Sequence, residues 1–212
     1  NNSYILEFIK RSEIALEALG YTEHGLNHLN MTADRARTLA KEIGLSKKDQ
    51  ELAAIATFCH DMGNFISRRN HHYFASVLFY QTFSKDFSPE EISLIVQAIA
   101  THDKDEMKFS NPISAIVVLA DKSDVRRERV VGNDINQIKM DIHDRVNYAT
   151  TLSRLKIDKN KKKVVLTLKI DTNFVPLMEY FEIFTARMAY CRTAAEYLGY
   201  KFSLVINNFK LL

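Results

Sequence analysis

The stretch LAAIATFCHDMGN, residues 52–64, indicates both how this chain folds and where its chemistry lies. Its first eight residues are mostly small and apolar, which favours a buried helix, and the run then ends on His60 and Asp61. An imidazole and a carboxylate are costly to bury side by side unless they are paired or hold a cation. The stretch therefore predicts a helical core with a cation site at the end of one helix.

The histidines are concentrated around this stretch, because six of the seven lie between positions 24 and 102. A single His-Asp pair is more often a helix-end or surface pairing, and two histidines four residues apart often form a half-exposed polar face. One shared site is favoured here because most of these residues fall near expected helix ends, where bundles often build metal sites. The residues concerned are His28, His60, Asp61, His72, His102 and Asp121.

Length and composition bound the kind of protein. The 212 residues can bury a sizeable core, and the net charge of +3 is weak. The two cysteines, Cys59 and Cys191, lie in apolar helical surroundings, so we expect reduced thiols in a cytoplasmic protein. No apolar run is long enough to span a membrane, and the first residues lack the order of a secretory signal. The basic run at 159–163 is interpreted as a hairpin turn, so no nucleic-acid duplex is expected as a partner.

Helix start and stop signals divide the first 150 residues into helices. Gly20 and Gly44 are expected stops, and Ser88-Pro89 and Asn111-Pro112 are expected starts. His24 and His28 would share one face of the second helix. The expected helices cover residues 3–19, 22–43, 46–61, 72–83, 88–102, 113–120 and 134–149.

After residue 150 the apolar pattern changes. Residues 152–157 and 165–170 alternate like strands, 175–198 carries the apolar stripe of a helix, and 200–207 alternates like a third strand. The fold class expected is therefore mainly α. A helical domain should cover residues 1–150, with a small β-β-α-β (α+β) module, residues 151–212, packed on it.

The candidate ligands offer nitrogen and oxygen donors. His28, His60, Asp61 and Asp121 would form a shell of two imidazoles and two carboxylates. Structural zinc sites favour thiolates, so this shell favours Mn²⁺, Fe²⁺, Co²⁺ or Mg²⁺. It also leaves room for water, which metal-assisted hydrolysis requires.

The positions of these residues resemble those of the HD-domain metal-dependent phosphohydrolases over about residues 20 to 130. The resemblance rests on His28-x-x-x-Thr32-Ala33, Cys59-His60-Asp61-Met62-Gly63-Asn64 and Leu119-Ala120-Asp121-Lys122. It implies an all-helical HD core that binds one or two divalent ions and hydrolyses phosphate mono- or diesters, often of nucleotides. It also implies primary ligands at His28, His60, Asp61 and Asp121, and ligands of a second ion at His72 and His102.

Three assignments within the resemblance have alternatives. His71 and His72 each precede a small residue by four positions, so the choice of His72 is nearly even. His24 stands where some members carry a ligand, and it is an optional ligand whose alternative is a local hydrogen bond. Lys122 and Arg126 follow Asp121 closely enough to be catalytic cations for the phosphate beside Asp61, and the resemblance supports Lys122, because family members carry a lysine there. Ion pairs with Asp124 and Glu128 are the alternative for these cations.

Two signatures of particular branches are missing from the sequence. There is no Gly-Tyr-Pro, as in cyclic-dinucleotide phosphodiesterases, and no Glu-Asp pair after the His-Asp, as in guanosine tetraphosphate hydrolases. We therefore expect a phosphohydrolase of another small phosphorylated substrate, above all a nucleotide. One alternative is a non-catalytic metal- or nucleotide-binding regulator whose C-terminal module is an interaction surface or forms a homodimer. The other is a scaffold with structural histidines.

Overall fold

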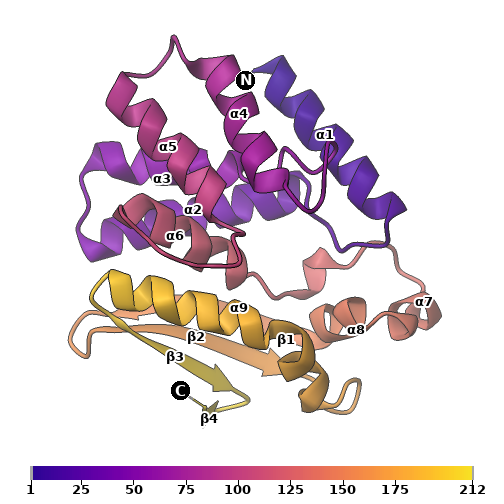
Figure 1. Cartoon of the computed structure of the whole chain (residues 1–212). Helices are drawn as coiled ribbons and strands as arrows, with labels where there is room; N and C mark the ends of the chain where they lie inside the picture. Colours follow the sequence, from indigo (N-terminus) through magenta and orange to yellow (C-terminus); the bar gives the residue numbers. More distant parts are fainter. Residues whose placement is uncertain (1, 212) are drawn as a thin grey trace. The chain divides into compact units, whose positions relative to one another are not determined.

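A computed structural model describes residues 2–211 (Figure 1). They form two compact units, one ending at Asp121 and the other starting at Lys122. The domain boundary expected at residue 150 stays a prediction. No helix among the described residues is long and apolar enough to cross a membrane.

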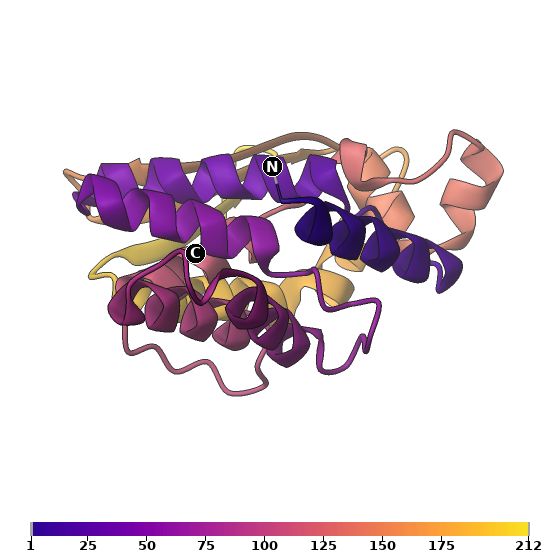
Figure 2. The same ribbon diagram turned by 90° about the horizontal axis from the view of Figure 1, so that it is seen from above.

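The first unit is built from helices. Figure 2 shows α2 and α3 side by side, α3 also packs against α5, and α5 packs against α4. The helix α3 is therefore central, and most of its small apolar residues are fully buried. The helices are α1 (Ser3–Ala18), α2 (Leu26–Ile43), α3 (Lys47–Cys59), α4 (His71–Phe83), α5 (Pro89–Thr101) and α6 (Pro112–Lys122).

Several of the predicted helix ends are confirmed. The Ser46 side chain caps α3 by accepting a hydrogen bond from the Asp49 amide at 3.1 Å. Ser88 and Glu91 form a reciprocal capping box at the start of α5. Gly44 ends α2 with a φ of 91°, a conformation that favours glycine.

The predicted start of the second helix was wrong. The helix α2 begins at Leu26 rather than near residue 22, because Gly25 is extended. The carboxylate of Glu23 accepts a hydrogen bond from the His28 amide at 3.1 Å and so satisfies a donor of the first turn. His24 therefore precedes the helix and does not share a helical face with His28.

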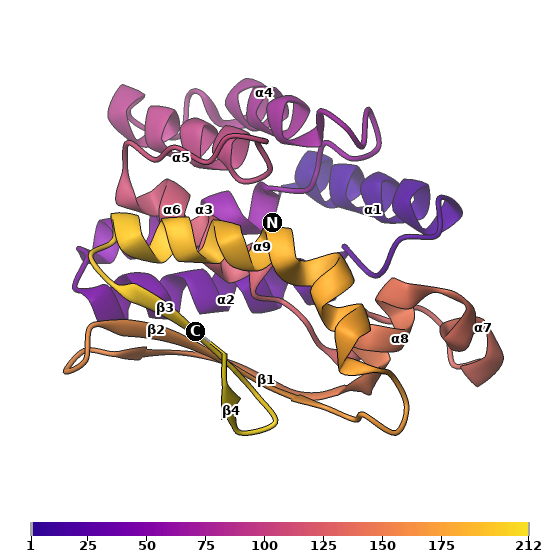
Figure 3. The ribbon, with the colours of Figure 1, turned by 60° about the horizontal axis from the view of Figure 1, so that its bottom comes forward.

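The second unit begins with short helices and ends in a mixed sheet. The sheet order is β1-β2-β3-β4, with β2 and β3 parallel and the other pairs antiparallel. In Figure 3, α9 runs along one face of this sheet. The elements are the 3-10 turn η1 (Arg127–Arg129), α7 (Ile135–Met140), α8 (Ile142–Ala149), β1 (Thr150–Asp158), β2 (Lys163–Ile170), α9 (Leu177–Tyr197), β3 (Lys201–Ile206) and β4 (Phe209–Lys210).

The β-β-α-β order is confirmed, and two details differ from expectation. The helix expected over 134–149 is two helices, because Asp141 is extended and its side chain caps α8. A fourth strand follows β3, because Asn207 and Asn208 adopt left-handed conformations that form a tight turn. Asparagine tolerates this conformation better than most residues, so the Asn-Asn pair was a usable signal.

Both cysteines are buried and free of disulfides. Burial raises the pKa of the Cys59 thiol to about 12, since a thiolate there would lose its solvation. We therefore expect almost no reaction of the native protein with Ellman's reagent at mildly alkaline pH, and two equivalents after denaturation. Rapid release of one equivalent from the folded protein would contradict the burial of these thiols.

Candidate metal centre

The ends of five helices of the first unit supply a cluster of imidazoles and carboxylates. His60 and His102 directly follow α3 and α5, and Asp121 lies in the last turn of α6. His28 lies in the first turn of α2, and His71 is the first residue of α4. The partial negative charge of the three C-terminal helix ends favours a cation, and the partial positive charge of the two N-terminal ends opposes it. The negative charges of Asp61 and Asp121 add to this, so the cluster favours a cation.

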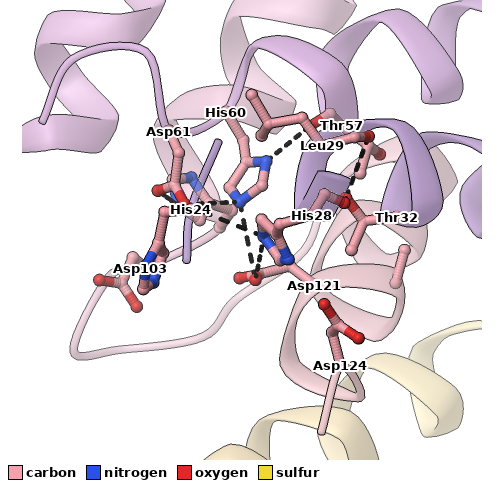
Figure 4. Close-up of polar contacts among 12 residues, drawn as sticks. His24, His28, Leu29, Thr32, Thr57, His60, Asp61, Asp103, Asp121 and Asp124 are labelled. Atoms are coloured by element: carbon pink, nitrogen blue, oxygen red, sulfur yellow. Dashed lines mark hydrogen bonds and ion pairs between the residues drawn. The ribbon is translucent and has the colours of Figure 1, made fainter. Parts of the chain in front are cut away.

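One half of the cluster, position A, is formed by His28, His60, Asp121 and the Oδ2 atom of Asp61 (Figure 4). The Nε2 atom of His60 lies 3.3 Å from Asp61 Oδ2 and 3.6 Å from Asp121 Oδ1. The Nε2 atom of His28 lies 3.5 Å from Asp121 Oδ1 and 3.9 Å from Asp61 Oδ2. Neighbouring ligands of one ion, each bonded at about 2.1 Å, lie about 3.0 to 3.4 Å apart. Position A is close to these separations.

The other half, position B, is formed by His71, His102 and the second oxygen of Asp61. The Oδ1 atom of Asp61 lies 3.2 Å from His71 Nε2 and 3.7 Å from His102 Nε2. The two Nε2 atoms lie 3.0 Å apart. Asp61 thus presents one oxygen to each position, which is the arrangement of a carboxylate that bridges two ions.

Three of the histidine rings are oriented by the same kind of hydrogen bond. In His60, His71 and His102 the Nδ1 atom donates to a backbone carbonyl three residues earlier. A carbonyl oxygen can only accept, so the Nδ1 atom carries a proton and Nε2 is the atom offered to the cluster. The buried Nε2 atom of His60 has no hydrogen-bond partner among residues 2–211. The acceptors are the carbonyls of Thr57, Arg68 and Ile99.

The electrostatics of position A favour positive charge. Burial opposes the charged form of His60, but Asp61 and Asp121 outweigh it and raise the pKa of His60 to about 10. Burial also opposes ionisation of Asp61, but the attraction of His60 and hydrogen bonds from the surrounding histidines hold the pKa of Asp61 well below its ordinary value. Asp61 is therefore ionised at neutral pH. A metal ion bound to His60 Nε2 must displace a proton from it.

The cluster contains His71 where the sequence favoured His72. The ring centroid of His72 lies 5.4 Å from that of His71 and 6.1 Å from that of His102. His72 instead contacts the ring of Tyr73, at 4.1 Å between centroids, and lines a neighbouring cavity. Of the two alternatives, the structure brings His71 rather than His72 to position B, and a ligand role for either stays a prediction. The other five predicted donors, His28, His60, Asp61, His102 and Asp121, lie together.

His24 lies beside the cluster, with its ring centroid 5.7 Å from that of His28. Its Nδ1 atom donates to the carbonyl of Thr22. The local hydrogen bond foreseen as the alternative for this residue is thus present.

The predicted catalytic cations belong to the second unit, where Lys122 is buried. The Nε atom of Arg126 donates to Asp124 Oδ1 at 2.8 Å, and Nη1 of Arg129 lies 3.2 Å from Asp124 Oδ2. The ion pair foreseen as an alternative for Arg126 is therefore formed. Contact of Lys122 and Arg126 with a substrate stays a prediction.

Two further residues at the cluster had no role assigned from the sequence. The Nδ2 atom of Asn64 donates to Asp61 Oδ1 at 3.0 Å, and its Oδ1 atom accepts from Arg68 at 2.9 Å, so Asn64 orients the shared carboxylate. The Oδ2 atom of Asp103 lies 3.8 Å from His71 Nε2. Asn64 is part of the quoted His-Asp motif, so its position in the sequence was a signal for a role at the site. Asp103 was marked only by following His102.

Comparison with known protein families gives a match over the part of the chain that holds the cluster. Residues 25–147, more than half of the chain, match the family described as HD domain. This range contains every donor of positions A and B. No curated protein matches the chain.

Proposed function

The chain belongs to the HD-domain family, and we propose from this and from its buried cluster that it is a divalent-metal-dependent phosphohydrolase. The observation that carries the proposal is the position of Asp61, whose two oxygens face two separate groups of inward-directed imidazoles. Histidines with a purely structural role would not require a carboxylate that faces two groups of imidazoles. A simple ion pair would need only one histidine beside Asp61.

The donors fit a divalent ion. When bound, such an ion polarises a phosphate ester and activates water for attack on phosphorus. Asp61 and Asp121 balance its charge, and the Nδ1 hydrogen bonds hold the imidazoles in their binding orientation. Because position B is rich in imidazole and lacks thiolate, Mn²⁺, Fe²⁺ or Co²⁺ fits it better than Mg²⁺.

The proposed substrate is a small phosphorylated molecule, with nucleotides as the first class to test. Charge that develops on its phosphate oxygens requires cations, and we assign this role to Lys122 and Arg126. The reduced, buried cysteines are consistent with a cytoplasmic enzyme. Asp61 would bind both ions and would thereby hold them beside the reacting phosphate.

The test is divalent-dependent phosphate release. Protein stripped with a chelator and reloaded with Mn²⁺, Fe²⁺, Co²⁺ or Mg²⁺ would be given nucleoside monophosphates, cyclic nucleotides and aryl phosphate mono- and diesters. We expect turnover that requires the added ion, and the active esters will separate a monoesterase from a diesterase. Tight metal binding without turnover across the panel would favour a regulator, and failure to bind any ion would refute the site.

A further inference from the structure

We propose that Asp103 is an additional ligand of the ion at position B and provides that position with a carboxylate of its own. The inference rests on the proposed function in one respect, namely that the cluster binds divalent ions. It adds a residue for which the sequence suggested no role. It also identifies the side of the cluster from which a substrate approaches.

The geometry of Asp103 matches that of the other donors. Asp103 follows His102 at the end of α5, and its Oδ2 atom lies 3.8 Å from His71 Nε2. This distance is similar to the 3.7 Å between His102 Nε2 and Asp61 Oδ1 within position B. It is too long for a direct hydrogen bond and longer than the separation of about 3.0 to 3.4 Å between neighbouring ligands, as are other separations within positions A and B, so these donors would draw together around an ion. In Figure 4, Asp103 lies on the side of Asp61 away from Asp121.

The charge balance of the two positions gives an independent reason. Position A has the carboxylate of Asp121 in addition to its share of Asp61, whereas position B has two imidazoles and only a share of Asp61. Two divalent ions held by two carboxylates would leave two positive charges uncompensated in a largely buried place, which is costly. A third carboxylate at Asp103 reduces this excess to one charge.

The exposure of Asp103 places it at the open edge of the cluster. Its side chain is 32% exposed, against 5% for Asp61 and 11% for Asp121. It also lines a cavity of about 560 Å³ together with His72, Tyr73, Arg69 and Lys104. Asp103 thus stands between position B and this cavity. A phosphate ester entering there would meet the cations of Arg69 and Lys104 before reaching the ions.

The experiment compares Asp103→Asn with the wild type and with Asp105→Asn. Asp105 lines the same cavity two residues further along, so its variant reproduces the change of charge without the proposed ligand. Each protein is loaded with Mn²⁺ and desalted, its metal content is measured, and its electron paramagnetic resonance spectrum is recorded. We expect two ions and a coupled-pair spectrum for the wild type and Asp105→Asn. For Asp103→Asn we expect loss of the coupled pair and about 10- to 100-fold weaker binding of the second ion.

The other outcomes separate this inference from the proposed function. If Asp103→Asn binds two ions with the affinity of the wild type, Asp103 is not a ligand. If the wild type binds a single ion and still releases phosphate, position B does not hold an ion and the inference fails, while the proposed function stands. Absence of any bound ion in the wild type would overturn both.

Discussion

Replacing Asp61 with alanine is expected to lower metal-dependent phosphate release by about 1,000-fold or more while the helices remain folded. The substitution removes the side chain that presents one oxygen to each position, so both ions would lose a ligand. Loss of about 4 kcal/mol of electrostatic stabilisation of the transition state corresponds to about 1,000-fold in rate. Initial rates at saturating Mn²⁺, metal content and circular dichroism of the same samples would measure the effect.

The matched control is Asp34→Ala on α2. The Asp34 side chain is 79% exposed and pairs with Arg37 at the surface, so its loss should leave turnover and metal content unchanged. Wild-type rates in Asp61→Ala would show that the chemistry lies elsewhere. A collapsed circular dichroism spectrum would instead assign Asp61 to folding, and Asp61→Asn, which keeps the shape of the side chain, would then separate the two roles.

Replacing Gly63 with alanine is expected to destabilise the protein by about 3 kcal/mol and to weaken ion binding at position B. A Cβ atom on Gly63 would lie 2.3 Å from the backbone oxygen of His71 and 2.6 Å from the backbone nitrogen of Ala75. These are backbone atoms of α4 and cannot rotate away, so the segment around Gly63 and the first turn of α4 must move apart, which displaces His71 relative to Asp61. Urea unfolding gives the change in stability, and titration of the metal-free protein with Mn²⁺ gives the loss of affinity at position B.

The control for this substitution is Gly25→Ala. A Cβ atom there would meet the carboxylate of Glu13, the far end of a flexible side chain that can rotate aside. Its cost should be about 1 kcal/mol or less, chiefly from a poorer N-cap. Equal unfolding free energies for the two variants would show that α4 does not approach the loop after Asp61 as closely as described.

Much of the fold followed from the sequence because helix ends are determined by local chemistry. The caps at Ser46 and Ser88 and the stop at Gly44 act within one helical turn, so they are readable without tertiary information. The start of α2 was misplaced because Glu23 caps it from five residues before the bonded amide, outside the usual capping positions. The division between α7 and α8 was overlooked because Asp141 looks like a surface residue of one continuous helix.

The candidate site was less completely predictable. His60, Asp61 and Asp121 follow buried apolar helices, and that local context marked them. The choice between His71 and His72 depends on which of the two rings the first turn of α4 directs toward the cluster. Each histidine precedes a small residue by four positions, so the sequence spacing could not distinguish them. Asp103 reaches position B only because the chain turns directly after α5, a feature that has no sequence pattern of its own.

The hydrogen bonds between imidazole Nδ1 atoms and carbonyls of the preceding turn have a consequence for how the protein acquires its ions. Each of these bonds is made within four consecutive residues, so the rings take up their orientation when the helix ends form. Little side-chain freedom is then left to lose on loading, which makes the entropic cost of capture small. Ions should enter and leave a preformed site as the supply in the surroundings changes. Small zinc domains fold only around their metal, so they cannot release it and stay folded.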